Sequence, residues 1–256
     1  MQEGTYTKGT CDGQFAELEL IREDKRNAMS EGLLSEIENF YRTLPKEVRV
    51  VILHGRGGHY CSGLDLAEHV SRTPEEGVYH SRRWHDVMDH IQFGGPVTIS
   101  AMTGAVIGGG LELATSTHVR IAEPSVIFQL PEGRRGIFVG GGATVRVGRI
   151  IGPDRMVEMM LTGRKYDAEE GLRLGLCHYR VDANQALPLA RKLAVKIAAN
   201  APMSNYFMIN ALTRIGDMSR GDGLFTESLA AALVQTTPDA EEGLRAFLEK
   251  REPKFR

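Results

Sequence analysis

The chain has 256 residues, of which 42% are hydrophobic and 25% are charged, and its formal net charge is −2. That length and apolar content suffice for one large domain or two smaller ones with a substantial core. The nearly balanced charge excludes a generally basic nucleic-acid-binding chain and a polyacidic tail protein. Only glycine is out of proportion. The 29 glycines among 256 residues are a larger share than the roughly 7% of average proteins, and they show no collagen-like period. We therefore expect the glycines to serve particular backbone sites.

The cysteines and the longest uncharged stretch indicate the compartment. Cys11, Cys61 and Cys177 are odd in number and far apart, and they form no Cys-x-x-Cys pair, so the sequence predicts neither a disulfide framework nor a zinc site. The N-terminus is polar and lacks the apolar core of a signal peptide. Residues 91–111 carry no charge, but their six glycines and one proline favour a buried strand and a glycine-rich turn over a membrane helix. We expect a soluble, cytoplasmic protein that contacts neither membrane nor nucleic acid.

Hydrophobic periodicity predicts strands alternating with helices along the first two thirds of the chain. FAELELIR at 15–22 alternates as a half-exposed strand does, whereas VRVVILH at 48–54 is a β-branched run typical of a buried strand. Further strands are expected at 97–107, 119–122 and 126–130. Helices are expected at 30–43 (opened by DKRNAM at 24–29), 75–91, 108–115, from about 143, 155–162 and 168–174. The inner face of the helix at 75–91 should comprise Val78, Trp84, Val87, Met88 and Ile91.

The character of the chain changes at Asn184, where strand signals stop. Helical patterns follow at 185–199, 204–218, 223–236 and 239–250. Strands with helical returns followed by a helical tail predict an α/β core, residues 1–183, and a C-terminal helical subdomain, residues 184–256.

Three glycine-rich segments share one design, because each follows a β-type run and leads into an expected helix. They are GGHYCSGLD (57–65), GAVIGGGLEL (104–113) and PEGRRGIFVGGG (131–142). Such a loop exposes backbone N–H groups at the positive end of a helix, which suits an anion or a developing oxyanion. Any one of them could equally be a plain turn. They lack the G-x-G-x-x-G and G-x-x-x-x-G-K-[ST] spacings of nucleotide-binding loops.

Two carboxylates, Glu112 and Glu132, lie within these segments. Apolar neighbours raise the pKa of a carboxyl by desolvation, which makes it useful as a general acid or base. Two alternatives need no catalysis: Glu112 could simply interact with the dipole of its own helix, and Glu132 could be an exposed acid paired with Arg134 or Arg135. No His, Asp or Glu spacing predicts a metal site.

Taken together, the segments resemble the crotonase (enoyl-CoA hydratase/isomerase) superfamily over essentially the whole chain. The matching pieces are DKRNAM (24–29), RVVILHGRGGHYCSGLDL (49–66), PVTISAMTGAVIGGGLELA (96–114), FQLPEGRRGIFVGGGATVRVGRIIG (128–152), MMLTGRKYDAEEGLRLGL (159–176) and EEGLRAFLEKREPKF (241–255). The resemblance implies an α/β fold, a crotonase-type spiral of ββα repeats with a C-terminal α-helical trimerisation region. It also implies an acyl-CoA substrate, no further cofactor, and self-association as a homotrimer or a dimer of trimers.

The resemblance assigns roles to particular positions. The backbone N–H groups of Ser62 and Gly109 would form an oxyanion hole, and Glu112 and Glu132 would flank one water molecule. The acyl pocket would be lined from within residues 69–91. The coenzyme A moiety would lie along Lys25, Arg26, Ala28, Ser62, Gly63, Leu64, Asp65 and Leu66, with Lys25 and Arg26 near its phosphates.

The activity implied is that of an enoyl-CoA hydratase, which adds water to a 2-enoyl-CoA thioester or catalyses the reverse dehydration. Glu132 would exchange a proton with the α-carbon, and Glu112 would orient and activate water. Another crotonase-type reaction, double-bond isomerisation or C–C bond cleavage or hydrolysis, remains an alternative. A non-catalytic CoA-binding scaffold is an alternative of a different class.

Several positions depart from the family pattern. Thr117 and His118 replace a usual Cys-Asp pair, Val139 replaces a usual proline, and the arginines beside Glu132 could lower its pKa. Trp84-His85 resembles the Trp-His pair of 4-chlorobenzoyl-CoA dehalogenases, but the position of their nucleophilic Asp falls on about Gly140. We therefore expect His85 to be a pocket or packing residue and His118 to be structural.

Overall fold

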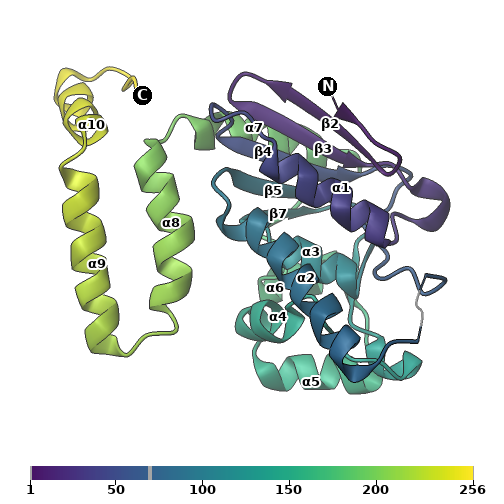
Figure 1. Cartoon of the computed structure of the whole chain (residues 1–256). Helices are drawn as coiled ribbons and strands as arrows, with labels where there is room; N and C mark the ends of the chain where they lie inside the picture. Colours follow the sequence, from purple (N-terminus) through teal and green to yellow (C-terminus); the bar gives the residue numbers. More distant parts are fainter. Residues whose placement is uncertain (1, 69–70, 256) are drawn as a thin grey trace. The chain divides into compact units, whose positions relative to one another are not determined.

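The computed structural model describes residues 2–68 and 71–255, which form two compact units (Figure 1). The first unit extends to Ala194, and the second begins at Val195. No helix within the described ranges is both long and apolar enough to cross a membrane.

The first unit contains a seven-stranded, mainly parallel sheet. Several of its strands are labelled in Figure 1. Its strands in spatial order are β1 (Gln2–Glu3), β2 (Thr7–Asp12), β3 (Phe15–Leu20), β4 (Val50–Gly55), β5 (Val97–Met102), β7 (Val119–Ala122) and β10 (Tyr179–Arg180). Neighbours from β3 to β10 are parallel, whereas β1 and β2 add antiparallel strands at one edge. Every residue of β5 is buried, as expected of a central strand covered on both faces.

A smaller sheet contains β6 (Ala105–Ile107), β8 (Ile127–Gln129) and β9 (Tyr166–Asp167). Cys61 pairs with Val106 as a parallel bridge and extends this sheet by one segment. The prediction of a single strand at 97–107 is therefore wrong, because β5 and β6 belong to different sheets. The chain turns between them at Gly104, whose φ is +53° and whose position would bring a Cβ within 2.3 Å of the Gly58 carbonyl oxygen.

Helices and short 3₁₀ turns return the chain between these strands. In the first unit they are η1 (Glu23–Lys25), α1 (Glu31–Arg42), α2 (Pro74–Phe93), α3 (Gly109–Thr115), η2 (Glu132–Arg135), α4 (Ala143–Ile151), α5 (Pro153–Thr162) and α6 (Ala168–Leu174). Local sequence explains the starts of α1 and α2. The Ser30 hydroxyl accepts a hydrogen bond from the Leu33 N–H, and Thr73 forms a capping box with Glu76.

Three successive segments of the chain follow the same path through the two sheets. Each leaves the large sheet, passes through the small sheet, enters a glycine-rich loop and continues into a helix or helical turn. The first segment contains β4, Cys61 and α2, the second contains β5, β6 and α3, and the third contains β7, β8, η2 and α4. This is the expected spiral of ββα repeats. Its consequence is that three glycine-rich loops meet where parallel segments of the small sheet end.

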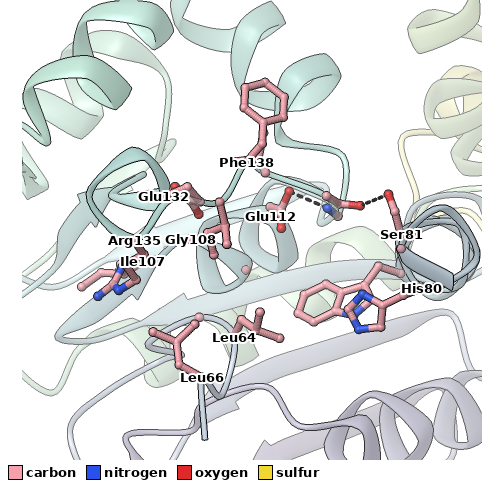
Figure 2. Close-up of a pocket in the computed structure, with 18 of the residues that line it drawn as sticks. Leu64, Leu66, His80, Ser81, Ile107, Gly108, Glu112, Glu132, Arg135 and Phe138 are labelled. Carbon is pink, nitrogen blue, oxygen red and sulfur yellow. Dashed lines mark hydrogen bonds between the residues drawn. The ribbon is translucent and has the colours of Figure 1, made fainter. Parts of the chain in front are cut away.

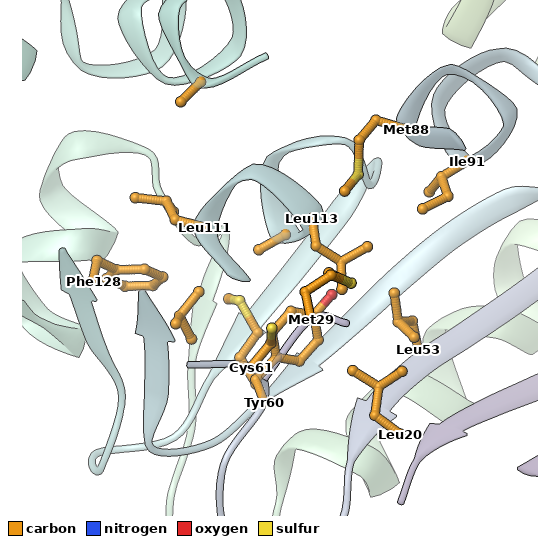
Figure 3. Packing of buried hydrophobic residues seen from close by; sticks show 14 of the residues in the cluster. Leu20, Met29, Leu53, Tyr60, Cys61, Met88, Ile91, Leu111, Leu113 and Phe128 are labelled. Atoms are coloured by element: carbon orange, nitrogen blue, oxygen red, sulfur yellow. The ribbon is translucent and has the colours of Figure 1, made fainter. Parts of the chain in front are cut away.

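Helices and sheets of the first unit enclose a continuous apolar core (Figure 3). Leu20 and Leu53 contribute from the large sheet, Leu111 and Leu113 from α3, and Phe128 from β8. Because Leu111 and Leu113 flank Glu112, burial of their side chains fixes the helix that carries this carboxylate. On α2 the predicted inner residues Trp84, Val87, Met88 and Ile91 are buried, whereas Val78 is exposed, so its assignment to that face is wrong.

The expected helical tail is present. α7 (Ala186–Ala198) crosses the boundary between the units, and α8 (Pro202–Ile215), α9 (Arg220–Gln235) and α10 (Pro238–Glu249) form the second unit. Ser219 and Thr237 cap α9 and α10 by accepting hydrogen bonds from backbone N–H groups.

The sequence carries no clear signal for the β1–β2 hairpin. TKGTCD in β2 turns Thr7 and Gly9 inward, and because neither is apolar, the alternation of buried residues leaves no hydrophobic pattern.

Candidate active site

A cavity of about 320 Å³ opens where the three glycine-rich loops meet (Figure 2). It is lined by Ser62, Gly63, Leu64, Leu66, Gly77, His80, Ser81, Trp84, Ile107, Gly108, Gly109, Glu112, Glu132, Arg135, Ile137, Phe138, Val139, Gly140 and Gly141. Both predicted carboxylates are therefore in one pocket. From the range 69–91 expected to line the acyl pocket, α2 supplies Gly77, His80, Ser81 and Trp84. His69 lies outside the described residues.

Glu112 is buried, and its carboxylate is held by the start of a different helix. Its Oε1 accepts hydrogen bonds from the N–H of Gly141 at 2.7 Å and of Ala143 at 3.1 Å. Burial raises the pKa of Glu112, against the opposing effect of these two donors and of Arg146. Glu112 also lies in the first turn of its own helix, as the alternative of a dipole interaction supposes, but the N–H groups that it accepts from belong to the 141–143 turn at α4.

Glu132 is also buried, at the start of η2, and it lies beside the turn that opens α3. A Cβ on Gly108 would lie 2.8 Å from its Oε1, and its Oε2 has no hydrogen-bond partner among the described residues. Burial raises the pKa of Glu132 to about 7, and the charge of Glu112 acts in the same direction.

The arginines that follow Glu132 do not neutralise it. Arg134 donates instead to the Thr162 carbonyl at 2.6 Å, and the charge of Arg135 lowers the pKa of Glu132 by less than burial raises it. The alternative of an exposed, arginine-paired loop acid is therefore wrong. Packing of the loop against the protein interior, which the sequence does not display, decides this outcome.

The structure contradicts the role expected for the Ser62 amide. The Ser62 N–H donates to the Arg26 carbonyl at 3.0 Å, and its hydroxyl donates to the Lys25 carbonyl at 3.2 Å. Ser62 therefore connects two loops and has no free N–H for an oxyanion. Two residues further on, the Leu64 N–H has no acceptor among the described residues, because the bridge to Met29 uses the Gly63 carbonyl and the Asp65 N–H.

The amides of Leu64 and Gly109 border the same small space. Gly109 is the first residue of α3, so its N–H precedes the intrahelical hydrogen bonds. A Cβ on Gly109 would lie 3.5 Å from the Leu64 nitrogen, and a Cβ on Gly63 would lie 3.3 Å from the Gly109 nitrogen. Trp84 covers this space, since its ring would be 2.8 Å from a Cβ on Gly109. Only a glycine leaves room for a ligand atom here.

Residues behind the site hold the predicted CoA-binding loops in place. Arg22 is 2.6 Å from the Asp65 carboxylate and donates to the Ala28 carbonyl at 2.9 Å. Burial opposes ionisation of Asp65, but donation from the Ala67 N–H and from Arg22 outweighs it and lowers the pKa of Asp65. The Asp65 side chain is thus engaged inside the protein, as a support of the loop that carries Leu64.

The other predicted CoA-binding side chains differ in exposure. Lys25 and Arg26 are exposed, whereas Ala28 is buried. Arg26 and Asn27 both adopt positive φ, and the Asn27 amide donates to the carbonyls of Arg56 and His59. This anchor fixes the turn that presents the two cations.

The two histidines singled out from the sequence have separate surroundings. His118 accepts from the Thr98 N–H at 2.8 Å, and its other ring nitrogen lies 2.9 Å from the Gln92 carbonyl oxygen, so it is structural as expected. His85 lies on α2 with Nε2 3.5 Å from the Ser81 hydroxyl. Gly140, at the position of the dehalogenase nucleophile, offers only a backbone carbonyl, which accepts from Ser81. Within residues 2–68 and 71–255 no group of three or more potential metal ligands occurs.

Known proteins similar to this chain belong to one family. The chain matches the enoyl-CoA hydratase/isomerase family model over residues 11–256. An enoyl-CoA hydratase-type structure from Rhodopseudomonas palustris CGA009 has 42% sequence identity and a TM-score of 0.93, covering 96% of this chain and 95% of its own. Human enoyl-CoA hydratase domain-containing protein 2, mitochondrial, is 33% identical over 95% of this chain and 86% of its own. (E)-Benzylidenesuccinyl-CoA hydratase of Thauera aromatica is 34% identical over 87% of both chains.

The spiral fold and the paired carboxylates beside free amides define a protein of the crotonase superfamily, a class that acts on acyl-CoA thioesters. Within that class, the chain belongs to the enoyl-CoA hydratase/isomerase family.

Proposed function

We propose that this protein is an enoyl-CoA hydratase, which adds water to a 2-enoyl-CoA thioester or catalyses the reverse dehydration. The observation that carries the proposal is the joint presence of two buried carboxylates and two unoccupied backbone amides in one cavity. A hydratase needs two proton-transfer groups around water, whereas a binding protein has no use for buried carboxylates of raised pKa.

In the proposed reaction, the thioester oxygen accepts hydrogen bonds from the N–H groups of Leu64 and Gly109. Attack of water on the β-carbon moves negative charge onto this oxygen, and the two donors stabilise the resulting enolate. The apolar side chains of Ile107, Ile137 and Val139 line the cavity and would accommodate an acyl chain.

The surroundings of the two carboxylates favour different roles for them. Glu112 has Oε1 fixed by two N–H donors, which orients the carboxylate and leaves Oε2 to accept a proton from water. Glu132 has a pKa of about 7, so a large fraction of it is protonated near neutral pH and can deliver a proton to the α-carbon.

The CoA moiety is proposed to lie along the two loops that Ser62 connects. Lys25 and Arg26 would meet its phosphates, and Ala28 and the segment 62–66 would contact the rest. Two observations support this placement. The side chains of Lys25 and Arg26 are exposed, and hydrogen bonds and ion pairs of Asn27 and Arg22 hold the neighbouring loops in place.

A panel of 2-enoyl-CoA thioesters with short, branched, long and aromatic acyl groups tests the proposal by loss of enone absorbance. The aromatic members are included because one relative is named as a benzylidenesuccinyl-CoA hydratase. Hydration of at least one member is expected. Isomerisation of a 3-enoyl-CoA that survives in Glu112→Ala, with no hydration of any member, would favour the isomerase alternative, and CoA binding without any turnover would favour a scaffold.

A bell-shaped pH profile of kcat/KM is expected. Activity should fall as pH rises through about 7, because Glu132 then loses the proton that it delivers. It should also fall at low pH, where Glu112 becomes protonated and cannot accept a proton from water. Stopped-flow hydration rates in the forward direction check both limbs, and a rate that keeps rising above pH 8 would contradict the role of Glu132 as acid.

The protein is proposed to self-associate and to be cytoplasmic. Self-association as a homotrimer or a dimer of trimers is supported by exposed apolar side chains of the second unit, among them Leu212, Phe225, Leu233 and Phe247. The three free cysteines, two of them buried, agree with a cytoplasmic location. The proposed chemistry uses protein groups and the substrate's own CoA, without a further cofactor.

A further inference from the structure

The peptide that joins Gly140 to Gly141 is held at both of its polar ends. The Ser81 hydroxyl donates to the Gly140 carbonyl at 2.7 Å, and the N–H of the same peptide donates to Glu112 Oε1 at 2.7 Å (Figure 2). The carbonyl and N–H of a trans peptide point in opposite directions, so fixing one of them fixes the other. A side chain on α2 thereby orients a donor to Glu112.

This peptide needs an external anchor. It is flanked by two glycines, and without a Cβ on either side its rotation meets little steric resistance. Rotation would withdraw the N–H from Glu112 and turn the carbonyl oxygen toward the carboxylate. The next peptide has its own anchor, because Arg146 donates to the Gly141 carbonyl at 3.0 Å and pairs with Asp89 at 2.8 Å. Ser81 is the corresponding anchor for the Gly140–Gly141 peptide.

We propose that Ser81 is a positioning residue that acts through the Gly140–Gly141 peptide to orient the Glu112 carboxylate for proton transfer. The proposal rests on the function proposed above, in which Glu112 activates water. The Trp84-His85 pair lies next to this peptide. Trp84 packs over Gly109 and Gly141, and His85 adjoins the Ser81 hydroxyl. No motif in the sequence relates Ser81 to Gly140, which lies 59 residues away.

Steady-state kinetics of Ser81→Ala test this positioning role. We expect kcat to fall about tenfold, the effect of losing one hydrogen bond, with KM changed less than about twofold. The low-pH limb should move to higher pH, because Glu112 loses a donor that favours its ionised form; its other charged neighbours, Glu132 and Arg146, are unchanged. Ser81→Thr keeps the hydroxyl and should restore most of kcat, and the exposed control Ser35→Ala should match the wild type. An unchanged kcat with a raised KM would instead make Ser81 a mere acyl contact and overturn the proposal.

A measurement independent of activity separates this proposal from the function on which it rests. The Glu112 carboxyl can be titrated by ¹³C NMR in wild type and Ser81→Ala, with Glu112→Gln identifying the resonance. A titration moved to higher pH in Ser81→Ala supports the positioning role of Ser81, and an unchanged titration overturns it. This outcome does not depend on whether the wild type hydrates an enoyl-CoA. If Ser81→Ala does not fold, Ser81→Cys, which keeps the volume with a weaker donor, supplies the same comparison.

Discussion

Glu132→Gln should reduce hydration of the best enoyl-CoA substrate by at least about 10²-fold while leaving CoA affinity nearly unchanged. Glutamine has the shape of glutamic acid but carries no transferable proton, so the α-carbon loses its acid. The carboxyl is buried in the cavity, and the residues proposed to bind CoA lie on other segments, so binding of the nucleotide part should persist. Initial rates and calorimetric titration with CoA measure the two effects separately.

The matched control for this substitution is Glu75→Gln, which changes an exposed carboxylate in the first turn of α2. It should hydrate at the wild-type rate. A Glu132→Gln protein with a rate close to that of the wild type would remove Glu132 from the mechanism. Thermal melting excludes a folding defect as the cause of any loss.

Gly109→Ala should reduce kcat/KM by about 10²- to 10³-fold, as much as the loss of an oxyanion-hole donor, because the added methyl group keeps the thioester oxygen away from an N–H that is itself retained. The new methyl group would lie 2.8 Å from the Trp84 ring and 3.5 Å from the Leu64 nitrogen. It would therefore occupy the space between the two amides that we assign to the thioester oxygen. Steady-state kinetics with an enoyl-CoA, alongside binding of the product analogue CoA, measure the loss.

Gly133→Ala is the control for a methyl group added near the same pocket. Its Cβ would lie 3.6 Å from the Met160 carbonyl oxygen, an ordinary contact, so activity should be retained. Gly109→Ala/Trp84→Phe separates two causes of the loss, because phenylalanine removes the ring atoms nearest the new methyl group. Full recovery of activity in the double variant would show that displacement of Trp84, and not occupation of the space beside Leu64, causes the defect.

Much of the fold is readable from the sequence because its signals are local. The β-branched run of β4, the Thr73–Glu76 capping box and the tail of helices after Asn184 each depend on neighbouring residues. The break between β5 and β6 is different. Residues 97–107 are uniformly apolar or small, and only the pairing of the two halves with different sheets shows that the chain turns at Gly104.

For the site, residue identity determined the components: the glycine-rich loops, both glutamates and Gly109. Only the tertiary structure decided which of them face the cavity and in what state. The direction of a loop N–H depends on its acceptor, so the Arg26 carbonyl, 36 residues from Ser62, engages that amide and leaves the one at Leu64 free. Likewise, burial outweighs the charge of Arg135 and raises the pKa of Glu132, because desolvation depends on everything packed around a carboxyl and not on its neighbours in the chain.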